Sequence, residues 1–372
     1  MGNPMKVWRR VLLAAAAAIP ACGGGGGGGT GGSLPPPPPG PPVAAVATPV
    51  GPQHSTVAID YTLYDAESDP VTIAAAFSTD GGITFSPALP AFGNGSLSGL
   101  ATSPGGTLHT FLWNSVDDGV ATGGGPVNTQ VRVRITPSDA AAGTAGTSGP
   151  FTVDNTIDRF IGVATATFPH SLTMVGNSET ALGNLVADSF RIRYGTQLAF
   201  QNGWGIRAPL PSGHRPADLT LRRPVSGYPP GPPYDLVLAD AYIILPFGNR
   251  VVTRTVAGSQ LWAMLELGVW NYPGNNNGFP QVSGFRFTFS ASNPGGARVL
   301  SVTLDGGSPI LNNSTTYTLA TNNFLNAGGD GYFMLNDGQG TVQELLAQVF
   351  ADHIERLGTV TPVIDGRMTV VP

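Results

Sequence analysis

A glycine-rich segment near the C-terminus, "TNNFLNAGGDGYF" (residues 321–333), combines residue types that could bind a small molecule. Three glycines surround a single carboxylate, Asp330, and two aromatic residues, Phe324 and Tyr332, lie close by in the sequence. A simple turn needs one glycine at most, whereas a loop that holds a ligand against its backbone needs more. A carboxylate only accepts hydrogen bonds and therefore suits a pair of hydroxyl groups. The segment therefore indicates a ligand-binding loop.

Three other segments also interrupt a regular element with glycine beside a functional side chain: "QNGWGIR" (201–207), "LPFGN" (245–249) and "QVSGFRF" (281–287). They add a further aromatic ring, Phe247, that could pair with Phe324. They also add an arginine, Arg207, whose planar guanidinium matches a phosphate group. Two aromatic faces can stack a heterocyclic base. Each ring taken alone is more often a core residue, but the ordered set favours a shared pocket.

These segments, with "SETALGNLVAD" upstream and "GSQLWAMLE" after the second, resemble the C-terminal domain of the 5'-nucleotidase family. The resemblance runs from about Ile157 to the end of the chain. In that family the domain binds the nucleoside part of the substrate. The resemblance implies that Phe247 and Phe324 sandwich the base. It further implies that Asn249 touches the base edge and that Asp330 accepts hydrogen bonds from the ribose.

The resemblance also implies a phosphate end to the pocket. Asn202 and Arg207 would face the phosphate, and Gly284 would offer a backbone contact. The sequence departs from the family pattern in three places. "HSLTMVGNSET" lacks the arginines usual before the first helix, Trp204 replaces a glycine of the usual "NGGGIR", and residues 208–235 form a proline-rich insertion, either a lid or a long loop.

Complete family members hydrolyse the phosphate in a separate N-terminal domain that holds two divalent metal ions. This sequence shows no such domain, and its histidines lie scattered, at His54, His109, His170, His214 and His353. "GNSE" at Gly176 reads as a helix start with Asn177 or Ser178 as the N-cap. We therefore expect no metal site or cofactor in this chain and little phosphatase activity of its own. A separate metallophosphoesterase chain is a possible partner, and a true hydrolase with an unrecognised metal site is an open alternative.

The N-terminus, "MKVWRRVLLAAAAAIPAC", has the basic start and short apolar core of a secretory signal. The only cysteine, Cys22, stands where a bacterial lipobox places its lipidated residue, so residues 1–22 predict a lipoprotein signal peptide. An ordinary signal peptide with an incidental cysteine is the alternative. The Gly/Pro-rich residues 23–42 form a linker that cannot pack a core. We expect an extracytoplasmic protein that a lipid anchors to a membrane or cell surface.

The sequence predicts two folded units, and the binding residues described above all lie in the second. Residues 43–154 alternate apolar and polar residues between short turn clusters, as Val131, Val133 and Ile135 do in "QVRVRITP". This pattern predicts an all-β sandwich of immunoglobulin or fibronectin type. Residues 157–372 mix helical stripes with strand patterns, which predicts an α+β domain.

Within the second unit, the helical stripes fall in "SETALGNLVADSFRIRYG", "GSQLWAMLELGV" and "TVQELLAQVFADHIERLG". The last of these predicts a helix that opens with a capping box from Thr341 and Glu344 and ends at Gly358. Strands are expected at "DAYIILPF", "RVVTRTVA", "GFRFTFSA" and "TYTLATNN".

The charge of the chain excludes one class of partner. Without the first 21 residues, which carry Lys6, Arg9 and Arg10 and no acids, 15 basic and 23 acidic side chains remain, a net charge of −8. No basic stripe is present, so a nucleic acid is not an expected partner. The sequence thus predicts a surface-anchored protein that binds nucleosides or nucleotides and is related to the hydrolases of nucleotide catabolism. The alternative is a structural or adhesive surface protein whose nucleotidase-like domain is degenerate.

Overall fold

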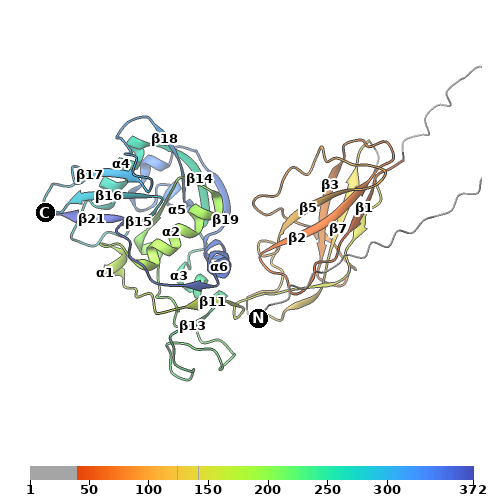
Figure 1. Ribbon diagram of the computed structural model, residues 1–372, viewed down its shortest axis with the longest axis horizontal. Helices are drawn as coiled ribbons and strands as arrows, with labels where there is room; N and C mark the ends of the chain where they lie inside the picture. The colour runs from red at the N-terminus through yellow and green to blue at the C-terminus, as the bar shows by residue number, and fades with distance from the viewer. Residues whose placement is uncertain (1–39, 124, 141) are drawn as a thin grey trace, which may run out of the picture. The chain divides into compact units, whose positions relative to one another are not determined.

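A computed structural model describes residues 40–123, 125–140 and 142–372 of the chain (Figure 1). The predicted signal peptide, Cys22 and nearly all of the predicted linker lie outside these residues. The described part is mainly β and contains several separate sheets.

The predicted N-terminal unit consists of antiparallel strands. One sheet has the order β1 (Val43–Val46), β2 (Thr56–Tyr64) and β5 (Thr107–Asn114). The other has the order β4 (Ser86–Pro87), β3 (Thr72–Ser78), β7 (Asn128–Ser138) and β8 (Gly146–Thr147), and β9 (Phe151–Val153) also pairs with β7.

The alternation in β7 is as predicted, because Val131, Val133 and Ile135 are fully buried in one core while the arginines between them are partly exposed. This pattern is what one buried and one solvated sheet face produce. A short parallel pair joins β6 (Thr122–Gly123) and β10 (Asn155–Thr156). The assignment of this unit to an immunoglobulin type stays a prediction.

A five-stranded sheet organises the C-terminal part of the chain. Its order is β15 (Pro280–Ser283), β12 (Leu198–Asn202), β18 (Thr316–Asn322), β14 (Arg250–Ala257) and β19 (Thr341–Leu345). β12 and β18 are parallel, whereas β15 and β14 run antiparallel to them. One smaller three-stranded sheet has the order β13 (Tyr234–Val237), β11 (Phe160–Ala164) and β20 (Thr359–Val360). Another has the order β17 (Val299–Leu304), β16 (Phe285–Ser290) and β21 (Met368–Val371).

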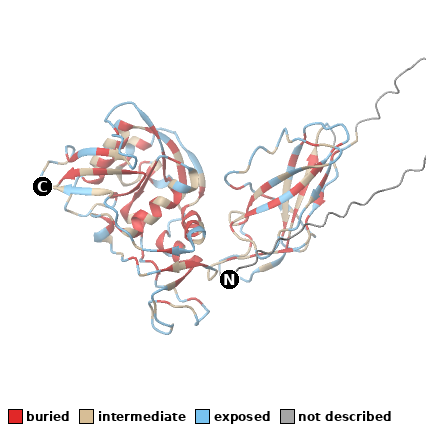
Figure 2. Cartoon of the chain, viewed as in Figure 1, coloured by how far each residue is buried: buried red, intermediate tan, exposed pale blue. Residues whose placement is uncertain are grey.

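Helices cover both faces of this sheet (Figures 1 and 2). Ala199 faces a core that α2 (Ala181–Tyr194) and α6 (Leu346–Leu357) complete, while its neighbours Leu198 and Phe200 face a second core that α4 (Gly258–Gly268) completes. The helical stripe expected in "GSQLWAMLELGV" is present in α4, because Leu261, Met264 and Leu265 are all fully buried. The predicted N-cap, Asn177 or Ser178, is wrong, because the N-cap of α2 is Thr180, whose side chain accepts a hydrogen bond from the Gly183 amide.

The remaining elements of this part are short. They are the short helices α1 (Leu172–Val175), η1 (Gly203–Gly205), α3 (Leu238–Ile244), α5 (Asn323–Asn326), η2 (Gly329–Gly331) and η3 (Phe333–Leu335).

Two predicted elements are wrong. The apolar run "DAYIILPF" forms helix α3 rather than a strand. Thr341 and Glu344 lie in strand β19 and not in a capping box, and the last helix begins only at Leu346. Glu344 instead accepts hydrogen bonds from Arg193 at 2.6 Å and from the Tyr194 hydroxyl at 2.8 Å. Pairing with β14 therefore outweighs the local helical signal at these residues.

The proline-rich insertion, residues 208–235, is held by a buried ion pair. The guanidinium of Arg223 donates to both carboxylate oxygens of Asp240 on α3, at 2.7 Å each, and both side chains are completely buried. Arg223 also donates to the carbonyl oxygens of Ser212, His214 and Asp235. One cation thus ties several turns of the insertion to the domain.

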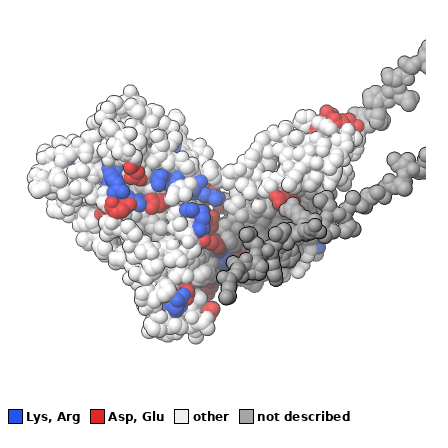
Figure 3. All heavy atoms as spheres, viewed as in Figure 1, with Lys and Arg blue, Asp and Glu red and all other residues white. Residues whose placement is uncertain are grey.

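The visible surface carries few charged side chains, and positive and negative groups are intermixed where they gather (Figure 3). Over the described residues, no helix is both long and apolar enough to cross a membrane.

Candidate nucleoside site

The pairing of the five-stranded sheet brings four turns to one of its edges. The parallel strands β12 and β18 end together at Asn202 and Asn322. β14 begins beside the end of β18, because Val251 pairs with Asn322, and β15 begins beside the end of β12, because Pro280 pairs with Asn202. The turns that follow β12 and β18, and those that precede β14 and β15, therefore meet.

A cavity of about 410 Å³ lies at this edge. This volume is within the range of roughly 300–1,000 Å³ that small-molecule sites usually have. Its lining residues are Asn202, Trp204, Gly205, Arg207, Phe247, Asn249, Asn277, Phe324 and Asp330. The structure thus brings together six of the seven residues that the sequence singled out as substrate-binding.

The two phenylalanine rings are accessible rather than part of a core. Phe247 is 58% exposed and Phe324 is 42% exposed, although both line the cavity. The Phe324 ring lies over the backbone of Gly329, where an added Cβ would come within 2.5 Å of the ring. Glycine at 329 is therefore what allows this ring to lie against the loop.

The carboxylate of Asp330 is held from both sides. Asn202 Nδ2 donates to one oxygen at 2.8 Å, and Asn277 Nδ2 donates to the other at 2.5 Å. Asp330 has a φ of 54°, a left-handed conformation that few residues other than glycine adopt and that often occurs at functional sites. Burial raises the pKa of the Asp330 carboxyl, and the hydrogen bonds from the two asparagines offset part of that rise.

A buried amide network supports Asn202. Its Oδ1 atom accepts hydrogen bonds from Gln201 at 3.1 Å and from Asn322 at 3.0 Å. Asn322 also caps α5 by accepting from the Leu325 amide. Gly205 leaves room for this network, since a Cβ there would lie 2.2 Å from Gln201 Nε2. The ends of β12 and β18 are therefore fixed to each other and to Asp330.

Arg207 lies at the rim of the cavity. Its guanidinium carbon is 5.7 Å from the centre of the Phe247 ring, a cation–π contact. Its Nη1 atom donates to the Trp204 carbonyl at 3.4 Å. Within the described part of the chain, Arg207 forms no salt bridge with an acidic side chain. Its guanidinium is therefore available to a ligand.

Gly284 is not among the cavity-lining residues. It has a φ of 86°, and a Cβ there would lie 2.0 Å from the Gln197 carbonyl oxygen. Packing of the turn between β15 and β16 thus accounts for this glycine, and its contact with a ligand stays a prediction. Tyr332, also noted in the sequence, is fully buried and donates to the Gly278 carbonyl at 2.5 Å.

Sequence reasoning missed Asn277 and gave Trp204 no definite role. Asn277 belongs to the run "NNNG" before β15, and no spacing within that run indicates a site. Its placement follows only from the antiparallel register of β15 and β12. Trp204 is half-buried, and its indole Nε1 donates to the Leu172 carbonyl at 3.0 Å, which fixes the ring against α1.

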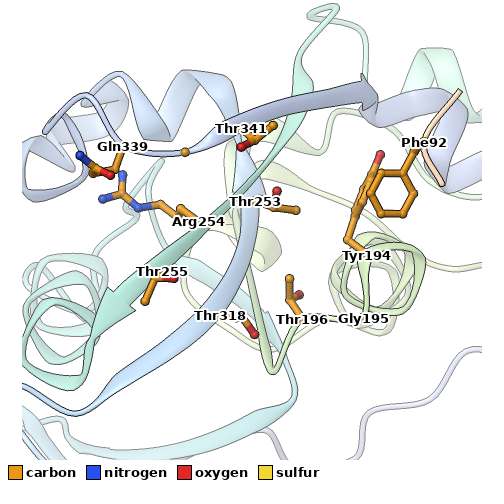
Figure 4. A pocket seen from close by; sticks show the side chains of 11 residues that line it. Phe92, Tyr194, Gly195, Thr196, Thr253, Arg254, Thr255, Thr318, Gln339 and Thr341 are labelled. Atoms are coloured by element: carbon orange, nitrogen blue, oxygen red, sulfur yellow. The ribbon is translucent and has the colours of Figure 1, made fainter. Parts of the chain in front are cut away.

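A second hollow lies over β14, β18 and β19, where Thr253, Thr255, Thr318 and Thr341 line it (Figure 4). Arg254 lines it as well, but this cation is committed to Asn326, the Leu335 carbonyl and Asp337. Tyr194 also lines this hollow, but its hydroxyl donates to Glu344, and no charged side chain of the described lining is free to recognise a ligand. The Asp330 cavity is therefore the stronger candidate.

Metal ligands are sparse. Within residues 40–123, 125–140 and 142–372, no group of three or more His, Cys, Asp and Glu side chains is arranged to hold a metal ion.

Comparisons with known proteins agree on one family. Residues 161–337 match the family model described as "5'-nucleotidase, C-terminal domain". A trifunctional nucleotide phosphoesterase of Bacillus subtilis is 32% identical over 210 residues, which cover 53% of this chain and 13% of that protein. A snake venom 5'-nucleotidase of Crotalus adamanteus is 28% identical over 208 residues, or 51% of this chain and 32% of that protein.

Among solved structures, a 5'-nucleotidase precursor from Thermus thermophilus has 27% identity and a TM-score of 0.49, over 65% of this chain and 50% of that one. The chain therefore spans no more than about half the length of each of these proteins. The predicted resemblance is confirmed for residues 161–337, and no match to a metallophosphoesterase domain covers the N-terminal region.

Proposed function

We propose, from the premise that residues 161–337 form a 5'-nucleotidase C-terminal domain, that this chain binds nucleosides or nucleotides in the Asp330 cavity. One observation carries the proposal. Two exposed phenylalanine rings, Phe247 and Phe324, line the same cavity as a carboxylate whose two oxygens are already held by amides.

Each lining residue has a role that its chemistry supports. The rings of Phe247 and Phe324 stack the base, and Asn249 contributes its amide to the base edge. Asp330 accepts hydrogen bonds from the two ribose hydroxyls. Among the described residues that line the cavity, Arg207 is the one cation, and it would face the phosphate of a ligand that carries one.

Isothermal titration of the protein with adenosine and AMP tests this proposal. We expect heat of binding and saturation at or below millimolar concentrations for at least one of the two. If neither ligand binds at millimolar levels, the alternative of a structural or adhesive surface protein replaces the proposal.

Hydrolysis of the phosphate is proposed to depend on another chain, a separate metallophosphoesterase. The lack of any cluster of three or more potential metal ligands among the described residues supports this division of labour. We expect the pure protein to leave AMP intact in the presence of manganese or zinc, as measured by phosphate release. Robust turnover by the pure protein would show that it is a hydrolase in its own right.

Anchoring at a membrane or cell surface is proposed on the basis of the signal peptide and Cys22. Replacing Cys22 with serine removes the thiol that a lipid would modify, so the variant should move from the membrane fraction to the soluble fraction of the expressing cells. Immunoblotting of both fractions measures this distribution. Equal membrane retention of the variant and of the unmodified protein would exclude the lipid anchor.

The pH dependence of adenosine binding should report on Asp330. Burial raises the pKa of this carboxyl in the free protein, whereas two donating hydroxyls favour its ionised form and lower that pKa in the complex. Affinity should therefore be highest at neutral pH and fall as the pH drops through the raised pKa, by at most about tenfold per pH unit. Titration between pH 7.5 and 4.5 measures this, and in the Asp330→Asn variant the affinity should be lower and nearly independent of pH.

Substitution of Gly329 by alanine should disturb the site through the Phe324 ring. The new methyl group would lie 2.5 Å from that ring and force it to turn. An off-rotamer ring costs about 0.5–1.5 kcal/mol, which predicts a roughly two- to tenfold higher dissociation constant for adenosine. Gly306→Ala, where a Cβ meets no atom within 4 Å, is the matched control. Equal affinities of the two variants would contradict the packing argument.

A further inference from the structure

We infer that the cavity selects the uncharged nucleoside over its 5'-phosphate. This inference rests on the proposed function and concerns the ligand class of the same site.

The charges that line the cavity cancel. Within the described residues, the charged members of the lining are Arg207 and Asp330, one cation and one anion. A phosphate monoester brings nearly two further negative charges at pH 7. One guanidinium cannot neutralise both Asp330 and such a group, so a bound nucleotide leaves the cavity with net negative charge, which opposes its binding.

Two of the three asparagine side chains that line the cavity are already directed at Asp330. Asn202 Nδ2 and Asn277 Nδ2 each donate to one carboxylate oxygen, and the Asn202 oxygen is an acceptor in the buried network. Asn202, predicted to face the phosphate, thus contributes to the sugar-binding carboxylate instead. These contacts favour hydroxyl recognition and leave few donors for a phosphate.

The segment beside Trp204 supplies no second cation. Residues 168–180, which include α1, contain neither lysine nor arginine. Trp204 donates to the Leu172 carbonyl of this segment at 3.0 Å, and a Cβ on Gly176 would lie 2.8 Å from the indole nitrogen. His170 in the same segment is within 2.8 Å of the Ile206 carbonyl oxygen and is therefore engaged as a donor to it. An indole thus occupies a position between this segment and the cavity, where it offers an aromatic wall rather than positive charge.

Calorimetric titration of the whole protein with adenosine, AMP and inorganic phosphate tests the inference. We expect adenosine to bind at least fivefold more tightly than AMP at pH 7.5 and low ionic strength. Phosphate at 10 mM should leave the adenosine affinity unchanged. Added salt should reduce the difference in affinity between adenosine and AMP, because ions screen the repulsion between the phosphate and Asp330.

The variant Asp330→Asn removes the negative charge of this side chain and nearly keeps its size. It therefore separates electrostatic repulsion of the phosphate from the steric fit of the ligand to the cavity. It should bind adenosine more weakly, and its ratio of AMP to adenosine dissociation constants should fall toward one. Equal or tighter binding of AMP by the unmodified protein would overturn the selectivity and leave the nucleoside site intact. Absence of binding by all three ligands would instead overturn the proposed function itself.

Discussion

Replacing Phe324 with alanine should raise the dissociation constant for adenosine about tenfold or more. The ring is 42% exposed, lines the cavity and rests on the backbone of Gly329, so its loss removes one of the two stacking faces. Stacking of a base on an aromatic side chain contributes about 1–3 kcal/mol, which corresponds to roughly five- to 150-fold in affinity. Calorimetric titration of the variant with adenosine measures the loss.

Phe333→Ala is the matched control for this experiment. Phe333 lies in the same glycine-rich region and is 76% exposed, but it does not line the cavity. We expect its removal to leave adenosine affinity within a factor of two or so, since an exposed ring outside the site makes no stacking contact. Comparable losses for the two variants, or no loss for Phe324→Ala, would show that the cavity does not stack the base in the proposed manner.

Replacing Arg223 with methionine should destabilise the folded protein strongly. The substitution leaves the Asp240 carboxylate completely buried without its cation, and it removes the donor to the carbonyl oxygens of Ser212 and His214. Breaking a buried ion pair by removing one partner costs about 3–5 kcal/mol. Urea denaturation followed by circular dichroism should show an earlier transition, and limited proteolysis should cut within residues 208–235.

The neighbouring Arg222→Met provides the comparison. Arg222 pairs with Asp235 at 2.6 Å, but its side chain is 39% exposed. An exposed pair contributes little to the free energy of unfolding, because water and salt screen it, so the urea midpoint of this variant should lie close to that of the unmodified protein. Similar shifts of the urea midpoint for both variants would mean that burial of the Arg223–Asp240 pair is not what stabilises the insertion. No residue between 208 and 235 lines the cavity, so folded Arg223→Met protein should bind adenosine normally.

Local patterns in the sequence predicted the elements whose residues alternate or repeat clearly. The two-residue period of β7 and the apolar stripes of α2 and α4 match buried positions in the structure. The run "DAYIILPF" failed because a short continuous apolar stretch has no period that separates a strand from a buried helix. The Thr341–Glu344 pair failed because the pairing of β19 with β14, formed between distant parts of the chain, decides the conformation there.

The cavity was predictable as far as its residues lie beside glycine in recognisable segments. Phe247, Phe324, Asp330 and Arg207 could be singled out in this way. Asn277 could not, because nothing within its own segment marks it and only the strand register carries it to Asp330. The use of Asn202 as a support for Asp330 was likewise hidden, since an amide side chain shows its partner only in three dimensions.

The cavity walls come from four turns at one edge of a sheet, whereas the fold is stabilised by two cores and by the strand pairing below them. None of the residues that line the cavity belongs to either of those cores, so substitutions among them can reshape the cavity without removing core contacts. The residues that shape the cavity and those that fill the cores are therefore separate sets, which suits this scaffold to laboratory redesign of the cavity.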